Sequence, residues 1–138
     1  MENTAAATPE QSWRGSGTIL VVDDEPAVRR TVSRMLEMMG FTTVQAADGA
    51  EGITLFKEQA SDIALVMLDL TMPRMDGEQT FRELRRVDPN VRVVLMSGFS
   101  QQDAVSQFIG KGLASFVQKP FSLDALRSCV QRVFTKAE

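Results

Sequence analysis

The sequence predicts an α/β fold, a doubly wound sheet of five parallel strands in the order 2-1-3-4-5 with helices on both faces. Strand-like and helix-like segments alternate along most of the chain. The strand-like segments are apolar at nearly every position, which is typical of strands that helices cover on both faces of a parallel sheet. The chain has no pair of similar halves long enough for a dinucleotide-binding fold, and this favours a single sheet.

The first part of the chain contains the signals of three strands and two helices. Pro26 suits the first turn of a helix, apolar residues follow it at helical spacing, and Gly40 ends that helix. A second helix is predicted over residues 49–59. Short apolar runs predict the three strands, which cover residues 18–22, 41–46 and 63–68.

The second part contains the signals of two strands and three helices. Asp88, Pro89 and Asn90 end the first of these helices, and Ser122 is a suitable N-cap for the last one. The middle helix has a narrow apolar stripe and therefore the weakest pattern. The predicted helices cover residues 77–87, 101–109 and 122–134, and the predicted strands cover residues 91–96 and 113–117.

Length and composition indicate one folded domain. Among the 138 residues we expect a flexible N-terminal linker over 1–17, a domain over 18–135 and a C-terminal tail over 136–138. The net charge of −3 argues against direct binding of nucleic acid, and the longest apolar run is too short to span a membrane. The single cysteine, Cys129, fits a reducing compartment, so we expect a cytoplasmic location.

Polar residues follow the predicted strands at the edge of the sheet where ligands bind in such folds. Asp23 and Asp24 follow the first strand, and Asp69 follows the third. Ser97 follows the fourth strand, and Lys119 follows the fifth. Because the carboxyl ends of parallel strands meet at one edge, we expect these five side chains to form a single site.

Each of these residues also has a simpler explanation. Asp23 and Asp24 are common types of helix cap, and Asp69 is a common residue at the start of a turn. Ser97 is compatible with an ordinary loop, and Lys119 with a solvated strand end. These explanations account for the residues one at a time, but they do not require three acids, a hydroxyl and an amine after different strands.

The charge of the predicted site calls for a cation. Carboxylates ~4–5 Å apart repel by about 3–4 kcal/mol per pair at an effective dielectric constant of about 20. The chain has no histidine, and oxygen ligands alone favour a hard ion such as Mg²⁺. With Lys119 and Ser97 as further donors, the set forms an electrostatic clamp for a phosphoryl group, and Asp69 is placed on a rigid strand as the nucleophile.

Four segments resemble the receiver domains of two-component response regulators, which have a flavodoxin-like fold: ILVVDDEP, LVMLDLTMPRMDG, VLMSG and FVQKPF. The resemblance covers residues 18–135. It implies that Asp69 accepts a phosphoryl group from a phosphohistidine of a partner, either a histidine kinase or a phosphotransfer protein. It also implies that Asp24, Asp69 and the backbone carbonyl of Thr71 bind Mg²⁺ directly, and that Asp23 acts through a water molecule.

The same resemblance implies roles for the surrounding residues. Ser97 and Lys119 contact the phosphoryl oxygens, and Phe116 changes rotamer together with Ser97. Thr71 and Phe99 stand where members of this family differ and where the lifetime of the aspartyl phosphate is tuned. The bond between Lys119 and Pro120 is expected to be cis, which would aim the lysine at the site.

The resemblance also sets expectations for output and context. We expect a partner surface formed by residues 101–109, 113–117 and 122–134, although Phe116 has the simpler explanation of a core residue. The stretch WRGSGTILVVDDE resembles the junction before a receiver in a hybrid histidine kinase, so the chain is either a fragment of such a kinase or a stand-alone regulator.

Two other functions remain as alternatives. The first is a receiver-like interaction module that works without phosphorylation, for which there is no reason to retain Asp69, Asp24, Ser97 and Lys119. The second is an aspartyl-phosphate phosphatase with a D-x-D motif, but Thr71 stands where the second acid is needed. We therefore expect a signalling domain that is not a turnover enzyme, with Mg²⁺-dependent phosphorylation and dephosphorylation of its own Asp69.

Overall fold

The computed structural model describes residues 15–70, 77–98 and 112–136, and its core is a five-stranded parallel sheet. The strand order is β2-β1-β3-β4-β5, as the sequence predicts. The strands are β1 (Thr18–Val22), β2 (Thr42–Ala46), β3 (Ile63–Asp69), β4 (Val93–Ser97) and β5 (Ser115–Gln118).

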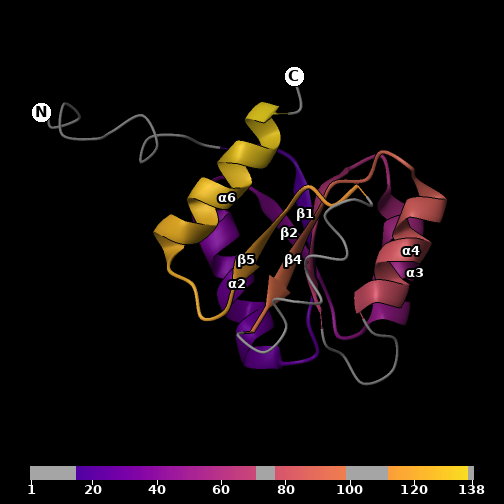
Figure 1. Cartoon of the computed structure of the whole chain (residues 1–138), viewed down its shortest axis with the longest axis horizontal. Coiled ribbons are helices and arrows are strands. Elements are labelled where there is room, and N and C mark those ends of the chain that lie inside the picture. Colours follow the sequence, from indigo (N-terminus) through magenta and orange to yellow (C-terminus); the bar gives the residue numbers. More distant parts are fainter. Residues whose placement is uncertain (1–14, 71–76, 99–111, 137–138) are drawn as a thin grey trace, which may run out of the picture.

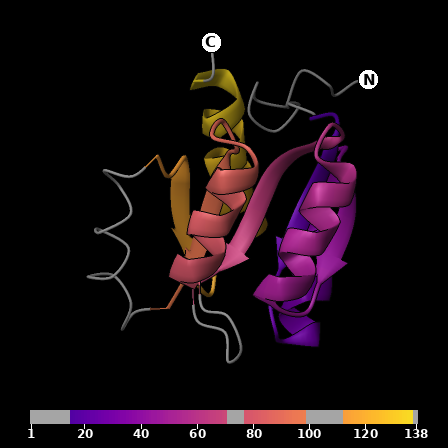
Figure 2. The ribbon, with the colours of Figure 1, turned by 90° about the vertical axis from the view of Figure 1, so that its right-hand side faces the viewer.

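The described helices cover both faces of the sheet and form a three-layer arrangement (Figure 1). α2 (Pro26–Met38) and α6 (Leu123–Lys136) pack on one face, where Leu36 and Val130 belong to the same buried cluster. α3 (Gly49–Gln59) and α4 (Gly77–Val87) pack on the other face, as Figure 2 shows. The two helix pairs give the sheet two separate apolar cores.

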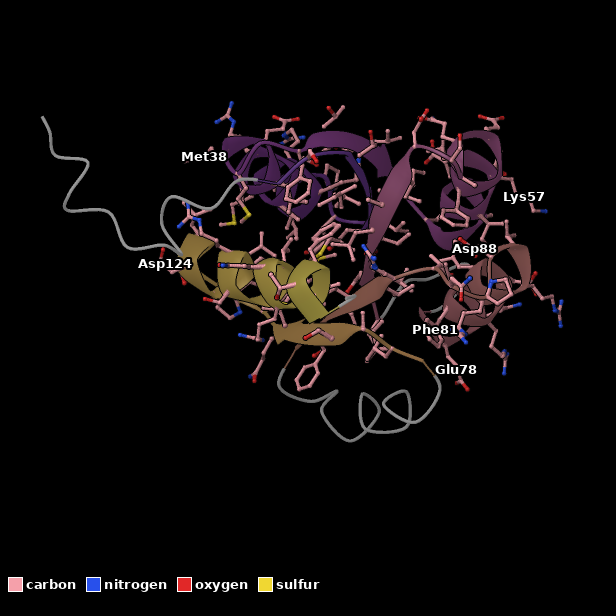
Figure 3. All side chains as sticks on the ribbon, turned by 90° about the horizontal axis from the view of Figure 1, so that it is seen from above. Met38, Lys57, Glu78, Phe81, Asp88 and Asp124 are labelled. Atoms are coloured by element: carbon pink, nitrogen blue, oxygen red, sulfur yellow. The ribbon has the colours of Figure 1, made fainter. Side chains whose placement is uncertain are left out.

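The strands in the middle of the sheet carry most of the buried apolar surface. Every residue of β4 is buried, and β3 has only one residue that is partly exposed. The edge strands β2 and β5 are half-exposed, so the expectation of full burial holds for the central strands only. Apolar side chains fill the space between the layers, whereas Lys57 and Asp124 lie at the periphery (Figure 3).

Local hydrogen bonds explain where two of the helices begin. The Asp48 carboxylate accepts from the Glu51 backbone N–H at 2.8 Å, which caps α3. The Ser122 hydroxyl accepts from the Ala125 N–H at 3.1 Å at the start of α6, which confirms the predicted cap. α2 begins at Pro26 without a side-chain cap, so the explanation of Asp23 and Asp24 as helix caps is wrong.

The predicted strands 41–46, 91–96 and 113–117 begin one or two residues too early. The Phe41 N–H donates to Leu36 at the end of α2, and the Val91 N–H donates to Asp88 in a turn. These N–H groups are engaged outside the sheet ladder, although the side chains are as apolar as those of the strands. The predicted helix 101–109 lies outside the described residues.

The first described residues are attached to the end of the domain opposite the carboxyl ends of the strands. The Gly15 N–H donates to the Met39 carbonyl at 2.9 Å, and the Thr42 N–H donates to the Gly17 carbonyl at 2.9 Å. The last residues of the segment expected to be a linker therefore contact the turn between α2 and β2. Among the described residues, no helix has the length and apolar character needed to cross a membrane.

Candidate functional site

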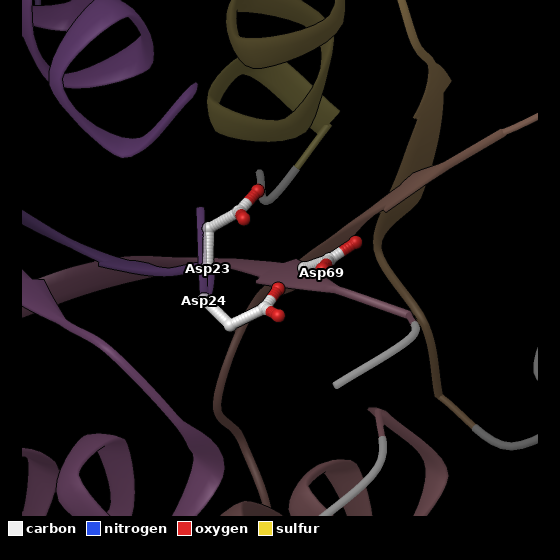
Figure 4. A group of neighbouring side chains, drawn as sticks. All are labelled: Asp23, Asp24 and Asp69. Atoms are coloured by element: carbon white, nitrogen blue, oxygen red, sulfur yellow. The ribbon is translucent and has the colours of Figure 1, made fainter. Parts of the chain in front are cut away.

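Three carboxylates converge at the carboxyl ends of the two central strands β1 and β3 (Figure 4). Asp23 and Asp24 follow β1 directly, and Asp69 is the last residue of β3. One oxygen of each carboxylate lies within 4.8 Å of the others. Asp23 and Asp69 are buried and Asp24 is exposed, so the cluster is open to solvent on the side of Asp24.

Lys119 reaches this cluster from the end of β5. Its Nζ lies 3.0 Å from Asp23 Oδ2 and 3.2 Å from Asp69 Oδ1. The Lys119 backbone N–H donates to the Ser97 carbonyl at 2.6 Å, and the bond from Lys119 to Pro120 is cis, as expected. These constraints direct the lysine back over the sheet, between two of the three acids.

The pKa of Asp69 reflects the crowding of negative charge. This pKa is raised from 3.8 to about 6: burial raises it most, the charge of Asp23 also raises it, and Lys119 opposes both. For Lys119, burial lowers the pKa, but the hydrogen bond to Asp23 and the charge of Asp69 outweigh burial and raise it. With all groups ionised, three acids and one amine leave two negative charges, the number that one divalent cation neutralises.

Ser97 lies at the end of β4, the strand next to Asp69. Its side chain is 1% exposed, and within the described part of the chain its hydroxyl oxygen has no hydrogen-bond partner. A buried hydroxyl without a partner is destabilising by about 1–3 kcal/mol. Such a group has a clear use if a ligand oxygen occupies the space beside it.

The donor set fits a magnesium ion. Carboxylate oxygens from Asp23, Asp24 and Asp69 are hard ligands, and Mg²⁺ is commonly held by one or two carboxylates together with water. The exposed side of Asp24 leaves room for water ligands. Thr71, whose carbonyl the resemblance adds to this set, lies outside the described residues.

A close backbone contact joins Leu70, which follows Asp69, to Gly77. The Gly77 N–H donates to the Leu70 carbonyl at 2.8 Å, and a Cβ atom at Gly77 would lie 2.6 Å from that oxygen. Only glycine permits this approach, which holds Leu70 and Gly77 together beside the acid cluster. The rest of the predicted turn from Asp69, with Pro73, lies outside the described residues.

Two predicted residues remain, Phe116 and Phe99. Phe116 lies on the edge strand β5 with 41% of its surface exposed, so its explanation as a core residue is wrong. Phe99 lies outside the described residues. Two contacts were missed at the sequence level: Glu25 lies 3.9 Å from Lys119 Nζ, and Arg29 donates to the Asp23 carbonyl. Both depend on how the chain turns into α2, which the sequence pattern does not specify.

The chain matches the family model of the response regulator receiver domain over residues 19–131. It is 34% identical to the sensor kinase CckA of Brucella abortus over 124 residues, which are 90% of this chain and 13% of that protein. It is also 34% identical to the chemotaxis protein CheY of Bacillus subtilis over 115 residues, which are 83% of this chain and 94% of that protein.

Solved structures share the fold over most of the chain. A response regulator receiver domain protein from Clostridium thermocellum superposes with a TM-score of 0.83 at 25% identity and covers 88% of this chain and 96% of its own. CheY in the CheX-CheY-BeF3-Mg²⁺ complex from Borrelia burgdorferi gives a TM-score of 0.81 at 30% identity, with 86% and 89% covered.

Proposed function

The chain belongs to the response regulator receiver domain family, and we propose that its Asp69 is the phosphoacceptor of a two-component phosphorelay. The family makes it a signalling domain and not a metabolic enzyme. The observation that carries the proposal is the surroundings of Asp69. Its carboxylate is held on a buried strand, 3.2 Å from Lys119 Nζ and one strand away from the unpartnered hydroxyl of Ser97.

The proposed reaction transfers a phosphoryl group from a phosphohistidine of the partner to Asp69. A carboxylate oxygen of Asp69 forms a bond to phosphorus while the bond between phosphorus and the histidine nitrogen breaks, and the histidine keeps the electron pair of that bond. Lys119 and Ser97 are positioned to donate to the phosphoryl oxygens, where negative charge is concentrated in the transition state. The rigidity of β3 holds the nucleophile in line for attack.

A bound Mg²⁺ would neutralise charge on both the carboxylates and the phosphoryl oxygens. We propose that Asp24 and Asp69 ligate the ion directly, that Thr71 adds its carbonyl, and that Asp23 acts through water. The solved complex of Borrelia CheY with CheX contains BeF3 and Mg²⁺, which supports the same ion for this cluster. Asp69 must be ionised to attack, so a cation that offsets its raised pKa also favours the nucleophilic form.

The phosphodonor must approach the open side of the site. An apolar cavity of about 270 Å³ lies beside Lys119, between α2 and residues 119–121. We propose that a histidine kinase or phosphotransfer protein docks across this cavity and so brings its phosphohistidine to Asp69. The downstream partner is proposed to bind the face formed by residues 101–109, 113–117 and 122–134.

The extent and context of the domain also remain proposals. We propose the receiver domain over residues 18–135, with a linker before it and a short tail after it. The chain spans 13% of the CckA sequence and 94% of the CheY sequence that it matches. A stand-alone regulator and the receiver of a hybrid kinase, both in the cytoplasm, are therefore compatible with this sequence.

The direct test is phosphorylation by a small phosphodonor. We expect the protein, incubated with Mg²⁺ and acetyl phosphate, to gain the mass of one phosphoryl group in an acid-stable, base-labile adduct. The Asp69→Asn variant should gain none, whereas Asp62→Asn removes an exposed acid at the start of β3 and should behave as the wild type. Absence of any adduct on the wild-type protein would instead favour the phosphorylation-independent interaction module.

A second test concerns the metal. Mg²⁺ that binds only the folded protein raises its stability in proportion to the logarithm of ion concentration over the dissociation constant. We expect the melting temperature to rise in millimolar Mg²⁺, and we expect Asp24→Ala to abolish that rise. In the absence of Mg²⁺ the same variant should be at least as stable as the wild type, because it relieves repulsion within the cluster. An equal Mg²⁺ effect in both proteins would exclude Asp24 as a ligand.

A further inference from the structure

We propose that Arg29 is a positioning residue that fixes the Asp23 turn and thereby sets the Mg²⁺ affinity of the acid cluster. This inference rests on the proposed function of the site, but it concerns a residue on α2 that is not a member of the cluster. Arg29 Nη1 donates to the backbone carbonyl of Asp23 with a donor–acceptor distance of 2.6 Å. It is the shortest of the side-chain hydrogen bonds that Asp23 makes within the described residues.

Every polar atom of Asp23 has a hydrogen-bond partner, and the four partners belong to four different residues. Its backbone N–H donates to Ala46 at 3.1 Å, and its Oδ1 accepts from the Glu25 N–H at 2.9 Å. Its Oδ2 accepts from Lys119 at 3.0 Å, and its carbonyl accepts from Arg29. Asp23 is 0% exposed, so a carbonyl that lost Arg29 would be a buried acceptor in need of a new partner.

The bond from Arg29 joins the acid turn to the body of α2. Asp23 and Asp24 are neighbours, so a rotation of the backbone at Asp23 changes the direction of both carboxylates. A metal site tolerates little error of this kind, and residues that orient ligands typically change metal affinity by about 10–100-fold when they are replaced. Arg29 is therefore placed to hold the geometry of two acids through one backbone group.

The position of Arg29 is difficult to explain by helix stability alone. It lies in the second turn of α2, whose first turn contains no acidic residue. Positive charge near a helix N-terminus is unfavourable because of the helix dipole. The hydrogen bond to the acid turn provides a reason for an arginine at this position that the helix itself does not provide.

The neighbouring residue, Arg30, allows the effect of the hydrogen bond to be distinguished from the effect of the charge. Arg30 carries the same charge one position further along α2 and is exposed. Loss of positive charge near three carboxylates should by itself strengthen the binding of a cation. Loss of orientation should weaken binding. The two effects have opposite signs. Replacement of Arg29 should therefore weaken Mg²⁺ binding, whereas replacement of Arg30 should leave it unchanged or strengthen it.

The experiment measures the dissociation constant of Mg²⁺ by calorimetry for the wild type, Arg29→Met, Arg29→Lys and Arg30→Met. Methionine keeps an apolar stem and removes the donor, and lysine keeps both a donor and the charge. We expect Arg29→Met to weaken Mg²⁺ binding about tenfold and Arg29→Lys to recover most of the loss. Arg30→Met should bind Mg²⁺ as tightly as the wild type or more tightly.

Two further measurements separate positioning from general damage. In Mg²⁺-free protein, amide exchange of Glu25 should accelerate in Arg29→Met, because the Glu25 N–H reports the bond to Asp23 Oδ1. At saturating Mg²⁺, the phosphorylation rate of Arg29→Met should return close to that of the wild type, so that the defect lies in metal affinity and not in the rate of transfer.

The inference is overturned if Arg29→Met and Arg30→Met change Mg²⁺ affinity equally, since charge alone would then explain both. It is also overturned if Arg29→Lys binds no better than Arg29→Met. These outcomes leave the proposed function intact whenever the wild-type protein binds Mg²⁺ and forms the Asp69 adduct. Failure of the wild type itself to form that adduct would contradict the proposed function and not the role of Arg29 in binding metal.

Discussion

At the scale of single residues, the site combines groups that are unfavourable in the metal-free domain. Asp69 and Asp23 are buried acids held near each other, and Ser97 has a buried hydroxyl without a partner. Lys119 is the counter-charge that both acids share. The acids would be stabilised by a cation, and Lys119 and Ser97 by a phosphoryl group. The groups that function needs therefore lower the stability of the metal-free domain.

Asp69 should make the metal-free protein less stable as the pH rises. Its pKa is raised from 3.8 to about 6, so the folded state binds this proton more tightly than the unfolded state does. The resulting stabilisation is complete below about pH 4 and is lost as the pH rises through about 6. We therefore expect Asp69→Asn to be more stable than the wild type at pH 8, on the order of 2 kcal/mol.

Chemical denaturation in a chelator between pH 3.5 and pH 8 would measure this difference. The comparison of two proteins isolates Asp69, because the other titrating groups are common to both. The advantage of the variant should shrink toward zero at the acidic end. A difference that stays constant across this range would show that Asp69 has no raised pKa in the folded state.

Ser97→Ala should separate stability from chemistry. The substitution removes a buried hydroxyl without a partner, so we expect unchanged or slightly higher stability, by up to about 1 kcal/mol. The rate of aspartyl-phosphate formation should fall by roughly tenfold or more, because one donor to the transferred group is lost. Ser33→Ala is the matched control, since Ser33, on α2, is also a buried serine whose hydroxyl has no partner among the described residues. It should alter stability only.

At the scale of elements, local chemistry decided which parts could be predicted. The helices Gly49–Gln59 and Gly77–Val87 have the predicted bounds, because Asp48, Gly77 and Asp88 give clear start or stop signals in the sequence. The strands were less certain, since Phe41 and Val91 are apolar but their N–H groups bind turns. Apolar character predicts burial, and it does not show which backbone groups join the ladder.

The candidate site was predictable to the extent that parallel topology gathers strand ends. That rule brings the acids, Ser97 and Lys119 to one edge without any knowledge of side-chain packing. Two features depend on the path of the loops and on how the elements pack in space: the contact between Arg29 and Asp23, and the exposure of Phe116. No spacing in the sequence reports either of them.

The attachment of the N-terminal segment to the domain gives a prediction at the element scale. Gly15 lies against Phe41, and a Cβ atom at Gly15 would overlap the end of that ring. The ring is buried and stacks on Phe134 with centroids 5.4 Å apart, while Arg92 covers Phe134 from 5.3 Å. The space cannot widen without disturbing this stack.

We therefore expect Gly15→Ala to destabilise the domain by about 1–3 kcal/mol through overpacking. The melting temperature should fall, while Mg²⁺ binding at the opposite end of the sheet should remain unchanged. Ser16→Ala is the control, because Ser16 is the next residue and is exposed. Equal melting temperatures for wild type and Gly15→Ala would mean that residues 15–17 do not pack on the domain in solution.

At the scale of the whole molecule, a signal at Asp69 must reach a surface that a partner can recognise. β4 and β5 connect the two regions, because Ser97 pairs in register with Gln118 and Leu95 pairs with Phe116. α6 packs against β5, where the Cys129 thiol contacts the Phe116 carbonyl at 3.8 Å. The backbone of Phe116 is therefore restrained, and its side chain is the part that is free to reorient.

Phe116 is the group most suited to a change of state. It is 41% exposed, and burial of the remaining ring surface is worth about 2 kcal/mol at ordinary values for apolar area. We expect the Ser97 hydroxyl to turn toward a phosphoryl group and thereby to make the space behind it available to the ring. Since phenylalanine has no hydroxyl, the inward state can be stabilised by packing alone.

We expect beryllium fluoride with Mg²⁺ to reduce the exposure of Phe116 and to slow amide exchange in β5. Fluorophenylalanine NMR, with the Phe116 signal assigned from Phe116→Leu, reports the first change, and hydrogen exchange reports the second. Ser97→Ala should bind the ligand more weakly and, at saturation, should shift the Phe116 signal less, because the space beside residue 97 no longer depends on where a hydroxyl points. The same ligand should leave in place the signal of Phe56, which is buried on α3 in the core between α3, α4 and the sheet. If the changes stay within the loops around Asp69 and never reach residues 113–117, the ring does not carry the signal, and the partner surface must be sought beside the acid cluster itself.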